Sequence, residues 1–263
     1  MTIKQYVAEQ KQELSNYVKT LSRAPRFTII QVNDDPASNS YIRGKIKDAN
    51  EIGVIADLIK LPETTSEEEL LKIVEKCNKD PEIAGLIVQL PLPKQISEDK
   101  VKLAIDPKKD IDGFHPLSKL NPCTPMGIID YLKHENIEIE GKNALVIGRS
   151  NIVGKPMAKL LLNNNATVTV AHSRTPKEEL DKYLANADII VVAVGRKYFI
   201  DNQKMKKIAV IVDVGINRVD GVLYGDVRPG QDVYLQTPVP GGVGLLTRLR
   251  LLKNLMEAYN NGI

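Results

Sequence analysis

The sequence predicts an α/β protein built from two domains. The chain has 263 residues, which is enough for one or two domains of ordinary size and for a substantial hydrophobic core. In both halves, short apolar runs typical of buried strands alternate with amphipathic stretches, and this alternation favours parallel sheets covered by helices. Between the halves, residues 106–125 contain four prolines and no periodicity, which indicates a crossover between two domains.

Composition and charge exclude several classes of protein. Hydrophobic residues make up 43% of the chain and charged residues 26%, close to the averages for globular proteins. A net charge of +3 and the absence of Trp argue against nucleic-acid binding. The chain has no apolar run of membrane-spanning length and no signal-peptide core at its N-terminus, so no membrane partner is expected. With only Cys77 and Cys123, no disulfide framework is implied, and a reducing compartment, the cytoplasm, is expected.

The first half is expected to begin with a helix over residues 2–22, where apolar residues recur every three or four positions. Residues 33–40 have the composition of a loop. Ser66 and Glu69 have the spacing of a capping box, which predicts a helix from there to residue 79. The remaining expected elements are strands at 26–32, 54–61 and 83–90 and a helix at 40–53.

The second half repeats the strand–helix alternation after an expected helix at 126–137. The expected strands are 143–148, 167–173, 188–195 and 207–216, and the expected helices are 155–164 and 176–187. Helical periodicity resumes at Thr247 and continues to the end of the chain.

A glycine-containing turn, VIGRSNIVGKPM at residues 146–157, links a strand to a helix. Gly148 and Gly154 permit a tight turn and close approach of the backbone to a ligand. A helix that opens near Lys155 is expected to offer free N–H groups and a partial positive charge to a diphosphate. The middle glycine of the dinucleotide-binding fingerprint is missing, so an ordinary strand-to-helix turn is the alternative.

The end of the following strand distinguishes between the two nicotinamide cofactors. NAD-binding proteins usually carry an acidic residue there, whereas this chain has His172, Ser173 and Arg174. Arg149 also lies within the glycine turn. Because guanidinium groups offer forked donors to phosphate oxygens, these residues favour NADP if a dinucleotide binds. For Arg174 alone, the alternative is a solvated surface charge.

A second group of polar residues lies in the first half. Tyr41 and Lys45 are four positions apart on an expected helix and therefore share a face. A phenol beside a buried ammonium can lower the lysine pKa, so that the amine exchanges protons near neutral pH; the alternative is a coincidence of two surface residues. Gln89 lies at the end of a strand, where open α/β sheets bind ligands. Asp110 and Asp112 lie in a loop, where turn formation is the alternative.

The segment TPVPGGVG at residues 237–244 contains two prolines and three glycines, which favour neither helix nor strand. We expect a rigid loop of the kind that approaches ligands closely, and a stiff linker between domains is a compatible alternative.

Taken together, these segments resemble the bifunctional methylenetetrahydrofolate dehydrogenase/cyclohydrolase family of one-carbon metabolism. Nine matches occur in the family's order over residues 27–247: ASNSYIRGKIK, GLIVQLPLP, KDIDGFHP, PCTPMGI, GRSNIVGKPM, ATVTVAHSRT, VDVGINR, GDV and TPVPGGVG. Each match is short, but nine in order make a chance resemblance negligible.

The resemblance implies how the fold is used. Residues 1–125 and 247–263 would form an N-terminal α/β folate-binding domain, and residues 137–236 a C-terminal Rossmann-like domain that binds NADP, with a deep cleft between the two. The implied reactions are the NADP-dependent oxidation of 5,10-methylenetetrahydrofolate to the methenyl form and its hydrolysis to 10-formyltetrahydrofolate. No metal is required for this chemistry, and a homodimer is implied.

The resemblance also implies roles for individual residues. Lys45 would be the catalytic lysine, with Tyr41 as its partner, Gln89 hydrogen-bonded near it and Asp112 on the amino-pyrimidine edge of the pterin. The remaining implied contacts are Val88, Leu90, Pro240, Gly241, Gly242 and Val243 for folate, and Gly148, Arg149, Ser150, Ser173 and Ile216 for NADP.

Two other functions share some of these sequence features. The pair Tyr41 and Lys45 imitates the catalytic pair of short-chain dehydrogenases, but in those enzymes the glycine turn precedes the pair, whereas here it follows. A non-catalytic sensor of folate or nucleotide would not need to retain Lys45, Gln89 and Asp112 together.

The chain also departs from the family's usual pattern. The loop between FHPL and PCTP is short, and Leu245-Leu246 replaces a usual Pro-Met. Arg248 and Arg250 stand where apolar residues are common. These differences bear on how the last helix docks.

Overall fold

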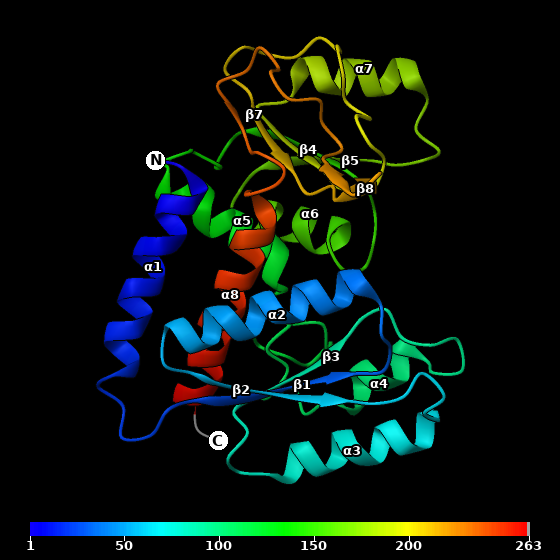
Figure 1. Ribbon diagram of the computed structural model, residues 1–263. Coiled ribbons are helices and arrows are strands. Elements are labelled where there is room, and N and C mark those ends of the chain that lie inside the picture. Colours follow the sequence, from blue (N-terminus) through cyan, green and yellow to red (C-terminus); the bar gives the residue numbers. More distant parts are fainter. Residues whose placement is uncertain (262–263) are drawn as a thin grey trace. The chain divides into compact units, whose positions relative to one another are not determined.

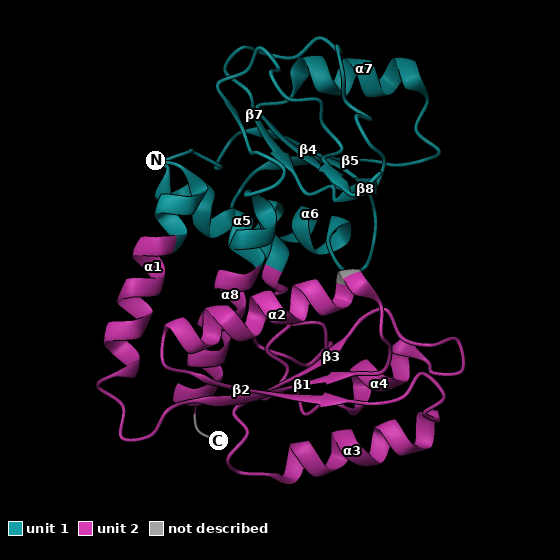
Figure 2. Ribbon diagram, viewed as in Figure 1, with its two compact units in different colours: residues 1–7, 124–247 teal, residues 8–123, 248–263 magenta. Residues whose placement is uncertain are grey.

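The computed structural model describes residues 1–261, which form two compact units (Figures 1 and 2). Unit 1 contains residues 1–7 and 124–247, and unit 2 contains residues 8–123 and the C-terminal segment from Arg248. The boundaries expected from the sequence differ at the N-terminus, which belongs to unit 1. There the ring of Tyr6 packs against the rings of Tyr131 and His134, with centroid distances of 5.5 and 4.5 Å.

Unit 2 is built on a three-stranded parallel sheet in the order β2-β1-β3. The strands are β1 (Arg26–Gln31), β2 (Ile55–Lys60) and β3 (Gly85–Gln89). Because β1 lies in the centre, the chain that leaves β1 crosses to β2 on one side, whereas the chain that leaves β3 continues on the other side. The carboxyl ends of these two strands therefore flank the point where open α/β sheets bind ligands, and Gln31 pairs with Gln89 there.

Helices cover both faces of this sheet. The helices are α1 (Ile3–Val18), whose first residues lie in unit 1, α2 (Pro36–Glu51), α3 (Glu67–Lys79), α4 (Glu98–Ala104) and α8 (Val243–Asn260), whose residues from Arg248 lie in unit 2. One core combines Phe27 and Ile29 of β1 with side chains of α2 and α8, and the other packs Ile30 against α3 and α4. Buried apolar strands between two apolar helix layers account for the parallel sheet.

Unit 1 contains a five-stranded parallel sheet in the order β10-β7-β6-β4-β5. Its strands are β4 (Asn143–Ile147), β5 (Thr167–Ala171), β6 (Ile189–Val192), β7 (Val210–Asp213) and β10 (Leu235–Gln236). Side chains of α5 (Cys123–His134) and α6 (Gly154–Asn163) pack on one face, and those of α7 (Lys177–Asn186) on the other. The direction of connection reverses between β4 and β6, which predicts a ligand site at their carboxyl ends.

Several elements differ from expectation. Helix α2 begins at Pro36, inside the expected loop, because Asp35 caps it by accepting a hydrogen bond from the Ser38 N–H at 2.7 Å. Helix α8 begins at Val243, so the segment 237–244 is not free of helix. Helix α4, strand β10 and the hairpin of β8 (Asn217–Val219) and β9 (Val222–Tyr224) were not expected.

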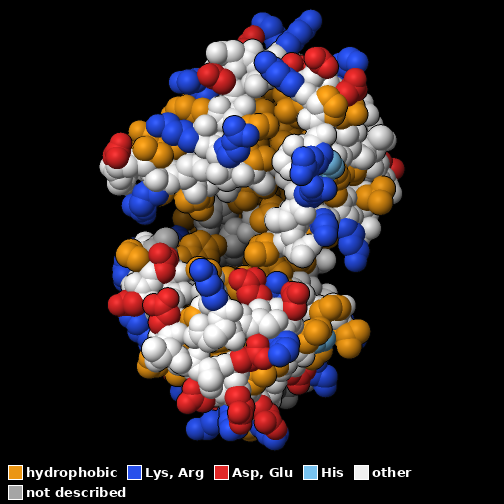
Figure 3. Space-filling model, turned by 90° about the vertical axis from the view of Figure 1, so that its right-hand side faces the viewer, with side chains coloured by type: hydrophobic (Ala, Val, Ile, Leu, Met, Phe, Trp, Pro, Cys, Tyr) orange, Lys and Arg blue, Asp and Glu red, His pale blue; other side chains and the backbone are white. Residues whose placement is uncertain are grey.

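The capping box expected before α3 is present: the Ser66 hydroxyl accepts from the Glu69 N–H, and the Glu69 carboxylate accepts from the Ser66 N–H. Among residues 1–261, no helix combines the length and apolar character that crossing a membrane requires. Acidic and basic side chains are interspersed on the face shown in Figure 3.

Candidate active site

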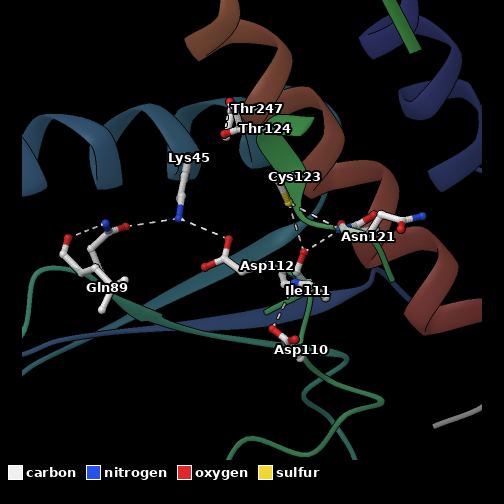
Figure 4. Close-up of polar contacts among 12 residues, drawn as sticks. Lys45, Gln89, Asp110, Ile111, Asp112, Asn121, Cys123, Thr124 and Thr247 are labelled. Carbon is white, nitrogen blue, oxygen red and sulfur yellow. Dashed lines mark hydrogen bonds and ion pairs between the residues drawn. The ribbon is translucent and has the colours of Figure 1, made fainter. Parts of the chain in front are cut away.

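A buried lysine lies at the carboxyl edge of the sheet in unit 2. Lys45, in the middle of α2, is only 4% exposed. Its Nζ donates a hydrogen bond to Gln89 Oε1 at 3.2 Å and lies 3.9 Å from Asp112 Oδ1 (Figure 4). Gln89 is the last residue of β3, and its own Nε2 donates to the Leu90 carbonyl at 2.9 Å. The ammonium group is thus held between an amide oxygen and a carboxylate, away from bulk water.

Tyr41 lies one helical turn before Lys45 and is half-buried. The Lys45 Nζ is 5.2 Å from the centroid of the Tyr41 ring, within the range of a cation–π interaction. The helix therefore places the two side chains on one face, as their spacing predicts.

Asp110, rather than Asp112, forms the turn in the loop that carries both. The Asp110 carboxylate accepts hydrogen bonds from the backbone N–H groups of Gly113 at 3.1 Å and His115 at 2.7 Å. Burial raises the pKa of Asp110 to about 6, although these N–H groups oppose the shift, and the charge of Asp112 raises it further. Because Asp110 makes the turn, the Asp112 carboxylate points toward Lys45 (Figure 4).

A small pocket lies between β3, α4 and the loop after α4 in unit 2, and of the residues around Lys45 only Asp112 lines it. Its lining includes Val88 and Leu90 around the end of β3, and Asp112, Phe114 and His115 from the loop. Its apolar lining, including Leu86, Val88 and Val101, belongs to the core that packs on α3 and α4, and Lys45 and Gln89 do not line it.

A polar network at the end of β1 was missed by sequence reasoning. Asn33 is buried, accepts a hydrogen bond from Gln31 Nε2 at 3.1 Å and donates one to the Pro91 carbonyl at 2.7 Å. The Ser38 hydroxyl donates to the Leu90 carbonyl at 3.4 Å. These bonds tie the start of α2 to the segment that follows Gln89. Polar residues at the end of an apolar run were the available signal.

In unit 1, the glycine turn lies where the sheet order reverses. Gly148 has φ +127°, and a Cβ there would lie 2.3 Å from the Ala193 carbonyl oxygen, beyond the end of β6. A Cβ on Gly154 would lie 2.3 Å from the Gly148 carbonyl oxygen. Both positions therefore require glycine for close packing of the turn.

The expectation of free N–H groups at the start of α6 is wrong for three residues. The Ser150 hydroxyl accepts from the N–H groups of Val153 at 3.1 Å and Gly154 at 3.3 Å, and the Ser150 carbonyl accepts from Lys155 at 3.0 Å. Ser150 lies three residues before the N-cap residue Val153 and satisfies N–H groups at the start of the helix, a role that its position in the turn did not reveal.

The residues expected to contact a dinucleotide lie beyond the strand ends of unit 1. Arg149 follows β4, and Ser173 and Arg174 follow the adjacent strand β5; all three are exposed. Ile216, after β7, is 60% exposed, an unusual position for a large apolar side chain. Two exposed guanidinium groups, a hydroxyl and an apolar surface fit a phosphorylated dinucleotide.

Asp226 holds the loop that follows β6, a role that the sequence did not predict. Its buried carboxylate accepts from the N–H groups of Val194, Gly195 and Arg196 at 2.7–2.9 Å and so fixes the loop after β6. The motif GDV contained this residue, but only tertiary contacts show what it binds.

The remaining expected folate contacts, Pro240 to Val243, belong to unit 1, whereas Lys45, Gln89 and Asp112 belong to unit 2. Gly241 has φ +92°, and a Cβ on Gly242 would lie 2.1 Å from the Pro238 carbonyl oxygen. Val243 is 4% exposed and packs in the core of unit 1.

The two unexpected arginines of α8 have acidic partners. Arg248 Nε lies 2.8 Å from Asp48 Oδ2, and Lys11 pairs with the other oxygen of that carboxylate. A Cβ on Gly44 would lie 2.1 Å from an Arg248 guanidinium nitrogen, so the missing side chain of Gly44 makes room for the arginine. Arg250 is buried and pairs with Glu257.

Comparison with known proteins places this arrangement in a family. The family model described as "Tetrahydrofolate dehydrogenase/cyclohydrolase, catalytic domain" matches residues 1–112, and the model of its NAD(P)-binding domain matches residues 122–262. The "Bifunctional protein FolD" of Halalkalibacterium halodurans is 48% identical over an alignment of 270 positions, which covers 97% of this chain and 96% of the relative.

Solved structures agree with these matches. The bifunctional methylenetetrahydrofolate dehydrogenase/cyclohydrolase FolD of Campylobacter jejuni is 38% identical, with a TM-score of 0.94 over 98% of this chain and 97% of that chain. The Trypanosoma brucei enzyme, solved with NADP and an inhibitor, is 31% identical, with a TM-score of 0.95 over 99% of this chain and 97% of that chain. The chain therefore belongs to the tetrahydrofolate dehydrogenase/cyclohydrolase family.

Proposed function

We propose that Lys45, Gln89 and Asp112 carry the folate chemistry of this bifunctional dehydrogenase and cyclohydrolase, and that NADP is its cofactor. The observation that carries the proposal is the buried Lys45 ammonium, which lies between the Gln89 amide and the Asp112 carboxylate. In this proposal unit 2 binds the folate and unit 1 binds the dinucleotide.

The first reaction oxidises 5,10-methylenetetrahydrofolate to a methenyl cation. When bound, NADP supplies the acceptor for the hydride that leaves the methylene carbon. The protein transfers no proton in this step, so its contribution is alignment. We assign Asp112 to the N–H groups on the amino-pyrimidine edge of the pterin, because a carboxylate offers only acceptors to such donors. Tyr41, Val88 and Leu90 in unit 2, and Pro240 to Val243 in unit 1, would complete the folate contacts.

The second reaction hydrolyses the methenyl cation. Water adds to the bridging carbon and loses a proton, which gives a carbinolamine. As the bond from that carbon to the pterin-ring nitrogen breaks, the ring nitrogen gains a proton and the carbinol hydroxyl loses its own, so the formyl group stays on the other nitrogen and one proton is released overall. A single amine that accepts one proton and donates another serves both needs. Lys45 is the amine at this site, Gln89 orients its Nζ, and Tyr41 packs against it.

For the cofactor, we assign the turn at Gly148, Arg149 and Ser150, together with Ser173 and Ile216. Arg149 and Ser173 would meet a 2′-phosphate, with Arg174 beside them. A carboxylate at the end of β5 would repel that phosphate, and this chain has none at residues 172–174.

The substitution Lys45→Met tests the proposal, since it keeps the apolar stem and removes the amine. General acid–base catalysis contributes about 10²–10⁴-fold, so we expect cyclohydrolase turnover to fall by at least 10²-fold. Dehydrogenase activity should remain measurable, and the methenyl product should accumulate with its own absorbance band.

Lys47→Met is the matched control, because Lys47 lies on the same helix with its side chain 76% exposed. It should leave both activities unchanged. Near-normal hydrolysis by Lys45→Met would overturn the assignment of the proton transfer to Lys45.

We also propose a homodimer in the cytoplasm. The cytoplasmic assignment draws on Cys77 and Cys123, which are both buried and free. Light scattering should give about twice the 29.2 kDa mass of one chain, and a monomeric mass at working concentration would exclude the dimer.

A further inference from the structure

Asn254, a polar residue with no exposed surface, lies in the middle of α8 among the leucines of the unit 2 core. A buried amide is costly unless its donors and acceptor are satisfied. Here Nδ2 donates to the carbonyl of Ile111 at 2.8 Å and to that of Asn121 at 3.0 Å. The amide oxygen accepts from Arg250 Nε at 2.8 Å. Nδ2 also lies within hydrogen-bond distance of Cys123 Sγ, at 3.4 Å. The amide is therefore fully bonded.

The two carbonyls mark the two ends of the loop that carries Asp112. Ile111 directly precedes Asp112, and Asn121 lies where the loop returns (Figure 4). The returning chain is packed tightly against the outgoing one, since a Cβ on Gly113 would lie 2.5 Å from the Asn121 carbonyl carbon. The Cys123 N–H also donates to the Asp112 carbonyl at 3.3 Å. One side chain of α8 thus ties both ends of the Asp112 loop to the core.

Arg250 determines which way round the Asn254 amide lies. An amide can present either its oxygen or its nitrogen, and its oxygen would repel the two carbonyls. By donating to Oδ1, Arg250 leaves Nδ2 to face Ile111 and Asn121. Glu257 pairs with the guanidinium, so the buried charge is compensated.

We propose that Asn254, oriented by Arg250, is a positioning residue that holds Asp112 at its place beside Lys45 and so sets folate affinity. Asn254 itself does not touch the substrate. This inference rests on the proposed function, because it assumes that Asp112 binds the pterin.

A double-mutant cycle tests the proposal. Tetrahydrofolate affinity is measured by calorimetry under anaerobic conditions for the parent, Asn254→Ala, Asp112→Asn and the double variant. We expect each single variant to weaken binding about tenfold or more, since each loses a hydrogen bond to a charged group or the positioning of that group. The double variant should bind within about twofold of Asp112→Asn alone, because residues that act through one another are not additive.

Leu252→Ala is the matched control. Leu252 lies on the same helix in the same core, and two residues correspond to about 200° around the helix, so it faces away from Asn254. It should lower the unfolding temperature, leave tetrahydrofolate affinity within about twofold of the parent, and combine additively with Asp112→Asn.

Arg250→Met supplies a second test if Asn254→Ala fails to fold. It keeps the amide and removes only the group that orients it, and its expected effect on affinity is about three- to tenfold, in the same non-additive relation to Asp112→Asn. Additive effects in these cycles, or an Asn254→Ala variant that behaves like Leu252→Ala, would overturn the positioning role. Normal affinity in Asp112→Asn would instead refute the assignment of Asp112 to the pterin, and the inference would fall with it.

Discussion

Asp110 gives a quantitative prediction, because its buried carboxylate titrates near physiological pH. Burial raises its pKa from 3.8 to about 6. The folded state therefore holds the Asp110 proton more tightly than the unfolded state. The stabilisation from this proton is fully present below the unfolded pKa and is lost as the pH rises through about 6. The folded protein is therefore less stable when Asp110 is ionised, even though backbone N–H groups donate hydrogen bonds to its carboxylate.

The magnitude follows from the two pKa values. A difference of about two pH units corresponds to about 3 kcal/mol of unfolding free energy over the whole titration. Between pH 5 and pH 7.5, where most other carboxyl groups stay ionised, the loss is about 1 kcal/mol. Asp110→Asn cannot titrate, so we expect its unfolding free energy to fall by about 1 kcal/mol less than that of the parent over this interval.

Urea denaturation at a series of pH values measures this difference directly. Asp213→Asn is the matched control, because Asp213 is also buried, in unit 1, with its pKa raised to about 6 chiefly by burial. Each variant should lose its own share of the pH dependence, and the double variant should lose both. A parent-like slope in Asp110→Asn between pH 5 and 7.5 would refute the reasoning that burial governs this carboxyl group.

Two further substitutions test other parts of the structure. Arg149→Ala should raise the Michaelis constant for NADP about tenfold or more and leave that for NAD nearly unchanged, because a charge-assisted hydrogen bond contributes about 1.5–3 kcal/mol. Steady-state kinetics with both cofactors measures this, with Lys159→Ala, an exposed residue on α6, as the control. Equal weakening of both cofactors would show that Arg149 serves the structure of the turn instead. Gly44→Ala should displace the Arg248 guanidinium from Asp48, at a cost of up to about 1 kcal/mol. Alanine in the interior of α2 should offset this cost by about 0.5–1 kcal/mol, so we expect little net change in the unfolding free energy. In an Arg248→Ala background only the gain should remain, and an equal effect of Gly44→Ala in both backgrounds, measured by denaturant unfolding, would refute the contact with Arg248.

The sequence by itself determined the fold class and the local devices that depend on neighbouring residues. The alternation of apolar runs with amphipathic stretches predicted both parallel sheets, and the capping box at Ser66 and Glu69 is formed by residues three positions apart. The shared face of Tyr41 and Lys45 follows from helix periodicity alone. The sequence also predicted the strand ends at the folate and dinucleotide sites, because the apolar runs stop at Gln89 and Gly148.

What tertiary structure decided is which group each polar side chain meets. Sequence spacing could not distinguish Asp110, which forms the turn, from Asp112, which faces Lys45, because both lie in one loop two residues apart. The same holds for Ser150, whose hydroxyl accepts from N–H groups at the start of a helix that was expected to offer them free.

The partners of Asn254 and Asp226 could not be predicted from the sequence, because they lie far away along the chain. Asn254 bonds residues more than 130 positions earlier, and Asp226 fixes a loop about 30 positions earlier. Local patterns report the helix or strand that a residue belongs to, because they arise from neighbours within a few positions. A buried hydrogen bond depends on where the packed elements bring distant groups together, so only the folded chain specifies it.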